Sequence, residues 1–190
     1  MYIRRRQRGV TFIELIIFIV VVAIGVAGIL GAINMSVSSS ADPLRRKQAL
    51  LIAESLLEEV QLANFSLCDP TSDNADTAAN AASCTIPENW GQSAPEPVGP
   101  RPFDNVNDYV AAAATPSSNL MSAGRVMDAT GTPFPAGYAA TIAIRPAALG
   151  GIGAAGAAAD TEVLRITVTV TFGGDTLVLD GYRTRHAPRL

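Results

Sequence analysis

The chain has 190 residues, the size of one ordinary domain, and 48% of them are hydrophobic while only 16% are charged. This composition excludes a chain that is disordered throughout, and the formal charge of -3 argues against a general nucleic-acid binder, which needs excess Lys and Arg to neutralise phosphates. The single histidine, His186, excludes a metal site built on two histidines and argues against catalysis by a Ser-His or Cys-His pair.

The first forty residues are patterned as a membrane-spanning segment. Four arginines lie within the first eight positions, and residues 15–33 then carry no polar side chain. As a helix rising about 1.5 Å per residue, this run spans roughly 28 Å, close to the thickness of the bilayer hydrocarbon. The basic residues at 45–47 that follow are fewer than the arginines before the run, which favours a cytoplasmic N-terminus and places the bulk of the chain outside the cytoplasm.

Three interpretations of this segment compete. It could be a plain membrane anchor, or a cleaved secretory signal peptide with residues 39–41 as its small-residue site, although the apolar run is longer than the usual limit of about 15 residues. Neither explains why Gly9 precedes the run or why Glu14 stands at its edge. A carboxylate at the head of a spanning segment is unfavourable without a partner and marks a functional site by default, unless it lies solvated at the headgroup level.

The third interpretation comes from the stretch RGVTFIEL, from Arg8 to Leu15, which resembles the type IV prepilin signal. That family has a short basic leader, a Gly, an apolar first mature residue and a Glu at the fifth mature position. Counting from Val10 makes Glu14 the fifth, and only Val10 itself departs from the usual phenylalanine. The resemblance implies cleavage after Gly9 by prepilin peptidase and N-methylation of Val10. It also implies that Glu14 neutralises the amino terminus of a neighbouring subunit during assembly.

A one-sided pattern after the apolar run predicts that the helix continues to residue 63. Pro43 removes a backbone donor and should start a new turn or kink the helix. Apolar residues then recur at three and four residues, which is an amphipathic stripe. The stripe consists of Ala49, Ile52, Ala53, Leu56, Val60 and Ala63. We expect Leu50, Leu51 and Leu57 to widen it, and Glu54, Glu58 and Glu59 to lie largely opposite. The basic residues 45–47 either contact lipid headgroups or an acidic neighbour, or form a solvated face, which is the interpretation we favour.

The middle of the chain is predicted to be a loop region, because nine of the twelve prolines lie between Pro70 and Pro135. Cys68 and Cys84 are the only cysteines, and in an oxidising compartment they are expected to form a disulfide rather than free thiols or a metal pair. The enclosed loop is rich in oxygen ligands: Asp69, Asp73, Asn74 and Asp76. Their spacing is not that of an EF-hand and no glycine marks the turn, so we predict a solvated loop and no metal site.

The only tryptophan, Trp90, is followed by a stretch at 101–109 that interleaves aromatic and polar residues. Either this stretch is a recognition surface at the end of a filament, or Phe103, Val106 and Tyr109 attach the loop to the core, which we favour. The stretches ADPLRRKQAL, PFDNVNDY and GYRTR resemble one branch of the pilin family, the MshD-like minor pilins of mannose-sensitive haemagglutinin (MSHA) systems.

The C-terminal part is patterned as an antiparallel sheet. Residues 138–145 alternate loosely as one strand, and an Ala- and Gly-rich connection at 147–160 follows. From residue 162 the alternation is strict, Gly173-Gly174 fits a two-residue hairpin turn, and 176–182 returns as the partner strand. The apolar face of this sheet is expected to cover the helix stripe.

Together these features predict an α+β, type IV pilin-like fold: a cleaved leader at 1–9, a long helix at 10–63, and a periplasmic head at 64–190 with a small antiparallel sheet. The resemblance implies a minor pilin of an MSHA-type pilus that acts in pilus biogenesis or priming. It implies other pilin subunits, prepilin peptidase, the inner-membrane assembly platform and membrane lipid as partners, with no nucleic acid, no cofactor and no enzymatic activity. The alternatives are a type II secretion pseudopilin and, with no convergent polar pocket in the sequence to support it, a membrane-tethered periplasmic binding module or enzyme.

Overall fold

The computed structural model describes residues 9–92, 95–96, 98–156 and 161–185, and for residues 36–42 it describes the backbone alone. Most of the predicted leader (residues 1–8), His186 and part of the Ala- and Gly-rich connection (157–160) lie outside the described residues. Helix α1 runs from Phe12 to Leu62 with Pro43 inside it, so the helical assignment continues through the proline. The chain divides into two compact units between Arg45 and Arg46, and each unit is described by itself.

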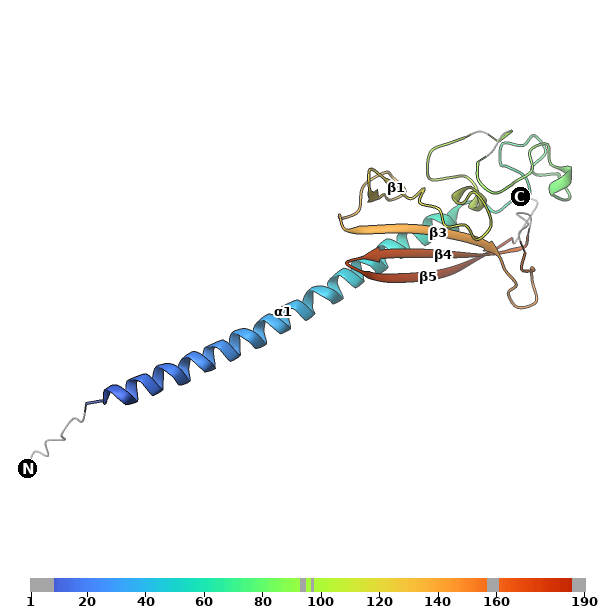
Figure 1. Ribbon diagram of the computed structural model, residues 1–190. Coiled ribbons are helices and arrows are strands. Elements are labelled where there is room, and N and C mark those ends of the chain that lie inside the picture. The colour runs from blue at the N-terminus through green and yellow to red at the C-terminus, as the bar shows by residue number, and fades with distance from the viewer. Residues whose placement is uncertain (1–8, 93–94, 97, 157–160, 186–190) are drawn as a thin grey trace, which may run out of the picture. The chain divides into compact units, whose positions relative to one another are not determined.

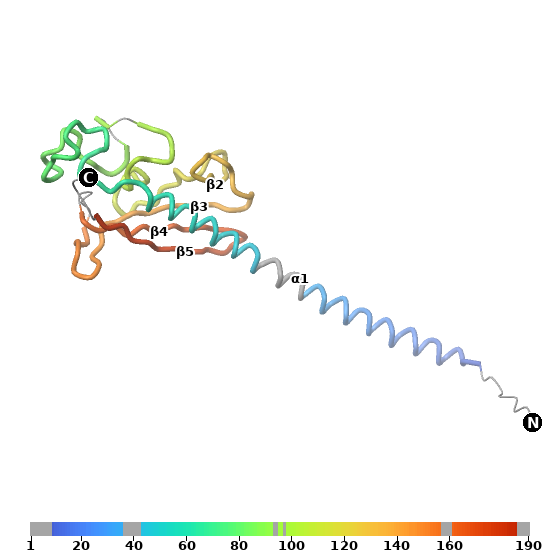
Figure 2. The backbone as a smooth tube through the Cα atoms, turned by 180° about the vertical axis from the view of Figure 1, so that it is seen from behind, coloured from blue at the N-terminus to red at the C-terminus, as the bar shows by residue number. Residues whose placement is uncertain are grey.

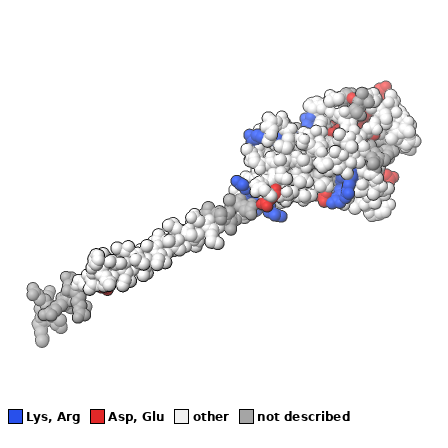
Figure 3. Space-filling model, in the orientation of Figure 1, with Lys and Arg blue, Asp and Glu red and all other residues white. Residues whose placement is uncertain are grey.

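The first unit is the apolar part of α1. The span Phe12–Met35 has a mean hydropathy of 3.0 and is long and apolar enough to cross a membrane. None of that span is buried within the chain, and apart from Glu14 its surface carries no charge (Figure 3). A 24-residue apolar surface of this kind is stable only in lipid or against other apolar helices.

The second unit contains a three-stranded antiparallel sheet in the order β3-β4-β5 (Figure 1). The strands are β3 (Tyr138–Pro146), β4 (Val163–Phe172) and β5 (Asp175–Thr184), each within two residues of its predicted range at either end. Both turn glycines between β4 and β5 have positive φ, 56° at Gly173 and 92° at Gly174, as a type I′ hairpin turn requires. The α+β fold with a long apolar helix and a small antiparallel sheet is therefore confirmed.

The core lies between the sheet and the second half of α1, which runs along one face of the strands (Figures 1 and 2). All six predicted stripe residues are buried there, and alternate residues of β3 and β4 face them. Gly181 of β5 shows how closely helix and sheet approach. A Cβ atom at this position would lie 2.6 Å from Gln61 Nε2 and 2.8 Å from Leu57 Cδ1, so only glycine fits here without a shift.

Two expectations about the helix stripe were wrong. Leu50 and Leu51 do not widen it, because they are 38% and 63% exposed. Glu59, expected on the far side, is buried. Successive helical residues are rotated by about 100°, so Leu51 lies about 140° from Leu56, whereas Glu59 lies only about 60° from it, on the flank of the stripe.

The described residues of the loop region contain four short elements: η1 (Ala81–Ser83), η2 (Val106–Tyr109), β1 (Met121–Ser122) and β2 (Arg125–Val126). Every residue of η2 is buried, and the ring of Phe103 meets that of Tyr109 edge to face with centroids 4.8 Å apart. Tyr109 is buried in the core and Phe103 packs half-buried against it, so these aromatic residues attach the loop to the core, as favoured above.

Candidate functional site

The N-terminal segment presents its peptide bonds openly. Gly9 and Val10 are exposed and precede α1 without regular secondary structure, and nothing described lies within 4 Å of a Cβ built on Gly9. The helix then begins at Phe12 with Thr11 in the N-cap position. The Gly9–Val10 bond therefore lies between two exposed residues outside the helix.

Thr11 and Glu14 form a capping box at the start of α1. The Glu14 N–H donates to Thr11 Oγ1 at 3.4 Å, and the Thr11 N–H donates to Glu14 Oε2 at 3.5 Å. This reciprocal pair satisfies two of the donors left open at a helix start, and the carboxylate lies at the positive end of the helix dipole. Glu14 therefore has a partner within its own chain, the Thr11 N–H, which its place at the edge of the apolar run did not indicate.

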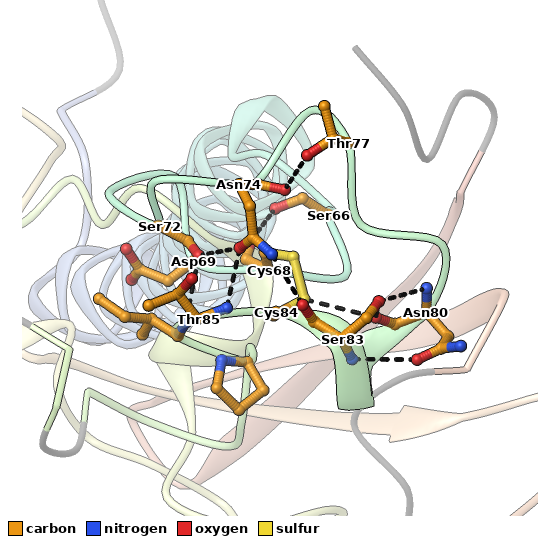
Figure 4. The surroundings of a disulfide bond; sticks show 12 residues. Ser66, Cys68, Asp69, Ser72, Asn74, Thr77, Asn80, Ser83, Cys84 and Thr85 are labelled. Atoms are coloured by element: carbon orange, nitrogen blue, oxygen red, sulfur yellow. Dashed lines mark hydrogen bonds between the residues drawn. A yellow bond between two sulfur atoms is a disulfide. The ribbon is translucent and has the colours of Figure 1, made fainter.

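Cys68 and Cys84 form a disulfide, which confirms that expectation, with the Cα atoms 5.4 Å apart (Figure 4). The loop it closes is organised by Asn74. Its Oδ1 accepts from the Thr85 N–H at 2.8 Å, and its Nδ2 donates to the Ser83 carbonyl at 2.7 Å. Asp73 and Asp76, which were considered as calcium ligands, are exposed. These two residues confirm the predicted solvated loop, but Asp69, expected to be solvated as well, is only 1% exposed, so the prediction was wrong at that position.

Backbone bonds hold two loop segments and η2 against the end of α1. The Glu88 N–H donates to Leu67 O at 3.1 Å, and the Asp69 N–H donates to Ile86 O at 3.0 Å, so the two segments of the chain that flank the disulfide are hydrogen-bonded to each other. On the other side, the Val106 N–H donates to Asn64 O at 2.9 Å. These backbone hydrogen bonds fix the positions of the segments that carry the buried acidic residues Asp69, Glu88 and Asp108.

The acidic side chains form a buried cluster that the sequence analysis did not predict. Glu88, Glu96 and Asp108 are all buried, and each places a carboxylate oxygen within 4.8 Å of the others. A second group of oxygens at the same spacing joins Glu96 to Asp69 and Asp104. Both oxygens of Glu88 lack a hydrogen-bond partner within the described part of the chain, as do Asp69 Oδ2 and Asp108 Oδ1.

This crowding shifts the protonation of the cluster. Burial, followed by the negative charge of Asp108, raises the pKa of Glu88 from 4.5 to about 9. Burial and the charge of Glu96 likewise raise the pKa of Asp108, against the Asn105 N–H that donates to Asp108 Oδ2 at 3.1 Å. Without a cation, the site therefore holds protons at neutral pH that ordinary carboxylates would release.

A second buried charge group joins α1 to the loops. Arg101 forms a two-pronged ion pair with Glu59, with Nε 2.7 Å from Oε1. The Tyr109 hydroxyl donates to the same Oε1 at 3.0 Å, and burial beside Glu59 raises the pKa of Tyr109. Arg101 also donates to the carbonyls of Leu120 at 3.3 Å and Met127 at 3.1 Å. All groups of this network are satisfied, so its role is structural.

Comparison with known proteins finds a match for the N-terminal segment of the chain. Residues 4–30 match the family model of the prokaryotic N-terminal methylation motif. No curated protein and no solved structure matches the chain. The motif supports a type IV pilin- or pseudopilin-type subunit and favours a structural subunit over an enzyme, and it implies processing by prepilin peptidase and assembly with other pilins. With the apolar helix, it fits anchoring in a membrane followed by incorporation into a filament.

Proposed function

We propose that this protein is a minor pilin of an MSHA-type pilus, made as a membrane-anchored prepilin. Prepilin peptidase cleaves it after Gly9, Val10 becomes the N-methylated first residue, and the apolar part of α1 then carries the subunit from the membrane into the filament. In the filament it packs non-covalently against other subunits and catalyses no reaction. It either primes assembly or lies at the filament tip. The head faces the periplasm before assembly.

The observation that carries the proposal is the combination of the methylation motif with an apolar helix that has no cover of its own. The motif at 4–30 overlaps the Phe12–Met35 span, none of which is buried within the chain. The surface that leaves lipid during assembly must be covered again, and neighbouring helices of the same kind provide that cover. The finer assignment to the MSHA branch rests on the resemblance of three short stretches.

Glu14 is the residue we assign to assembly. In the single chain its carboxylate is held by the Thr11 N–H at 3.5 Å, a long hydrogen bond that is readily exchanged. Cleavage after Gly9 creates a new amino group on Val10, whose charge in a low-dielectric helix bundle needs an opposite charge. The Glu14 carboxylate of a neighbouring subunit can form an ion pair with this amino group, and only its weak hydrogen bond from the Thr11 N–H is lost.

The decisive measurement is the N-terminal mass of the protein from native membranes or sheared filaments. We expect a chain that begins at N-methylated Val10, whereas a chain that retains residues 1–9 would refute processing. Gly9→Val should block cleavage. Glu14→Ala should leave cleavage intact but prevent incorporation, while the matched control Glu54→Ala, an exposed helix position beyond the span, should leave both intact. Normal filaments containing the Glu14→Ala subunit would contradict the assembly role.

Deletion of the gene separates the pilus from the secretion alternative. Loss of surface pili with protein secretion intact supports the minor pilin, and loss of secretion with pili intact supports a type II secretion pseudopilin instead. Both phenotypes are scored in the same strain, with the wild-type chain and Glu14→Ala supplied in trans.

A further inference from the structure

Two buried carboxyl groups of the acidic cluster in the second unit have no basic partner among the described residues. Glu88 is 4% exposed and Asp108 is 3% exposed, yet neither forms an ion pair with a described Lys or Arg. The two ion pairs of the described residues, Arg101–Glu59 and Arg165–Asp180, involve other carboxylates. A buried carboxylate is strongly unfavourable unless it is neutralised by a proton, a basic side chain or a metal ion.

The geometry of the cluster fits one hard cation. Oxygen ligands bind calcium at about 2.4 Å, so two oxygens on opposite sides of the ion are about 4.8 Å apart. The carboxylate oxygens of Glu88, Glu96 and Asp108 all lie within 4.8 Å of one another and can therefore belong to a single coordination sphere. Asp69 and Asp104 meet the same limit with Glu96, so they extend the cluster on its other side.

Glu88 supplies the independent sign of a ligand. Both of its oxygens are inaccessible to solvent and lack a hydrogen-bond donor in the described residues, although the Glu88 backbone is fixed by the bond to Leu67. Buried side-chain oxygens are otherwise nearly always satisfied. A side chain that is rigidly placed, buried and aimed into a group of other carboxylates, with no donor of its own, is arranged for a cation.

We propose that Glu88, Glu96 and Asp108 bind one calcium ion, with Asp69 and Asp104 adding negative charge beside Glu96. Calcium fits better than magnesium because it accepts six to eight oxygens in flexible geometry and is readily enclosed by carboxylates, whereas magnesium demands a regular octahedron and keeps several waters. The ion joins the segment after the disulfide, the segment at residues 95–96 and η2. This site is separate from the N-terminal segment, so it goes beyond the proposed assembly role and can fail without it.

Trp90 offers a direct probe of the site. It lines the same pocket as Asp108, so a terbium ion bound in the cluster can be excited through the indole ring. The full chain in mild detergent is treated with EDTA, dialysed and titrated with TbCl3, and bound terbium is then displaced with CaCl2 or MgCl2. We expect sensitised terbium emission that calcium abolishes at least tenfold more effectively than magnesium. Absence of emission, or equal displacement by magnesium, overturns the calcium assignment.

Thermal unfolding of the same samples gives a second, independent readout. At 100-fold excess over its dissociation constant, calcium should raise Tm by about 5–10 °C. Glu88→Gln should abolish this rise while leaving the metal-free protein at least as stable as wild type, because an amide is neutral without taking up a proton on folding. Asp108→Asn should also abolish the rise. The matched control Glu58→Gln changes an exposed carboxylate and should keep the full rise. A calcium-induced rise of wild-type size in both cluster variants would refute the site.

Discussion

Replacing Arg101 by methionine should destabilise the second unit strongly, because Arg101 is the only described basic side chain that pairs with Glu59. The side chain of Glu59 is only 4% exposed and that of Arg101 only 11%, so solvent cannot take over the lost interaction. Removing one partner of a buried pair generally destabilises by about 3–5 kcal/mol, since it leaves an uncompensated charge. The Tyr109 hydroxyl still donates to Glu59, so we expect the lower half of that range.

A double-mutant cycle separates the pair from its surroundings. Glu59→Gln removes the charge but keeps an acceptor oxygen for Tyr109 and Arg101 Nε, and we expect it to destabilise by about 1–3 kcal/mol because the second bond of the pair, from Arg101 Nη2, is lost. In the Arg101→Met, Glu59→Gln double variant no charge is left buried. We therefore expect a loss smaller than the sum of the two single losses, by about 2 kcal/mol.

Urea unfolding of the full chain in detergent, followed by the fluorescence of Trp90, measures these differences in the second unit, where the tryptophan lies. Arg165→Met is the matched control: its ion pair with Asp180 is about one-third exposed on each side, so solvent screens it and the loss should be clearly smaller. Equal losses for the Arg101 and Arg165 variants, or strict additivity in the cycle, would refute the buried-pair reasoning.

Three further predictions concern the second unit. In EDTA, the free energy of unfolding should fall as pH rises from about 5 to 9, by up to about 1.4 kcal/mol per pH unit for each proton. Over this range the folded state keeps the proton of Glu88, whose pKa is about 9, while the unfolded state releases it near 4.5. Urea titrations across that range test this, and Glu88→Gln should flatten the profile. Gly181→Ala should destabilise by less than about 1 kcal/mol, because its Cβ would overlap only the movable ends of Gln61 and Leu57, whereas Gly156→Ala, with open space around it, should change Tm little. Replacing both Cys68 and Cys84 by serine should destabilise by about 3 kcal/mol through loop entropy, measured by urea unfolding; an unchanged midpoint would show that the loop is ordered without the bond.

Regular periodicity made the helix and the sheet predictable. The stripe from Ala49 to Ala63 follows the helical repeat, and the strict alternation in β4 follows the strand repeat, so both could be assigned from local spacing. Leu51 and Glu59 differ from expectation because angular position on the helix, rather than hydrophobicity, decides which residues face the sheet.

The two buried charge groups were not predictable in the same way. Glu88 and Asp108 lie twenty residues apart, in loops without periodicity, and they meet only through backbone pairing and the disulfide. One local signal was available: the spacing of Asn105 and Asp108 is that of a capping box, which marks the start of η2. It indicates a turn of helix, but not what that turn packs against.

The contacts of Arg101 have a consequence for the order of folding. They join residues 19, 26 and 42 positions apart in the chain, and the Tyr109–Glu59 bond joins residues 50 apart. The β4–β5 hairpin, in contrast, closes over two glycines. Because closing a long loop loses more chain entropy before any contact compensates it, the hairpin should form before the Arg101 network. The loops that carry the acidic cluster should then be the first to open in hydrogen exchange, while the sheet is still protected.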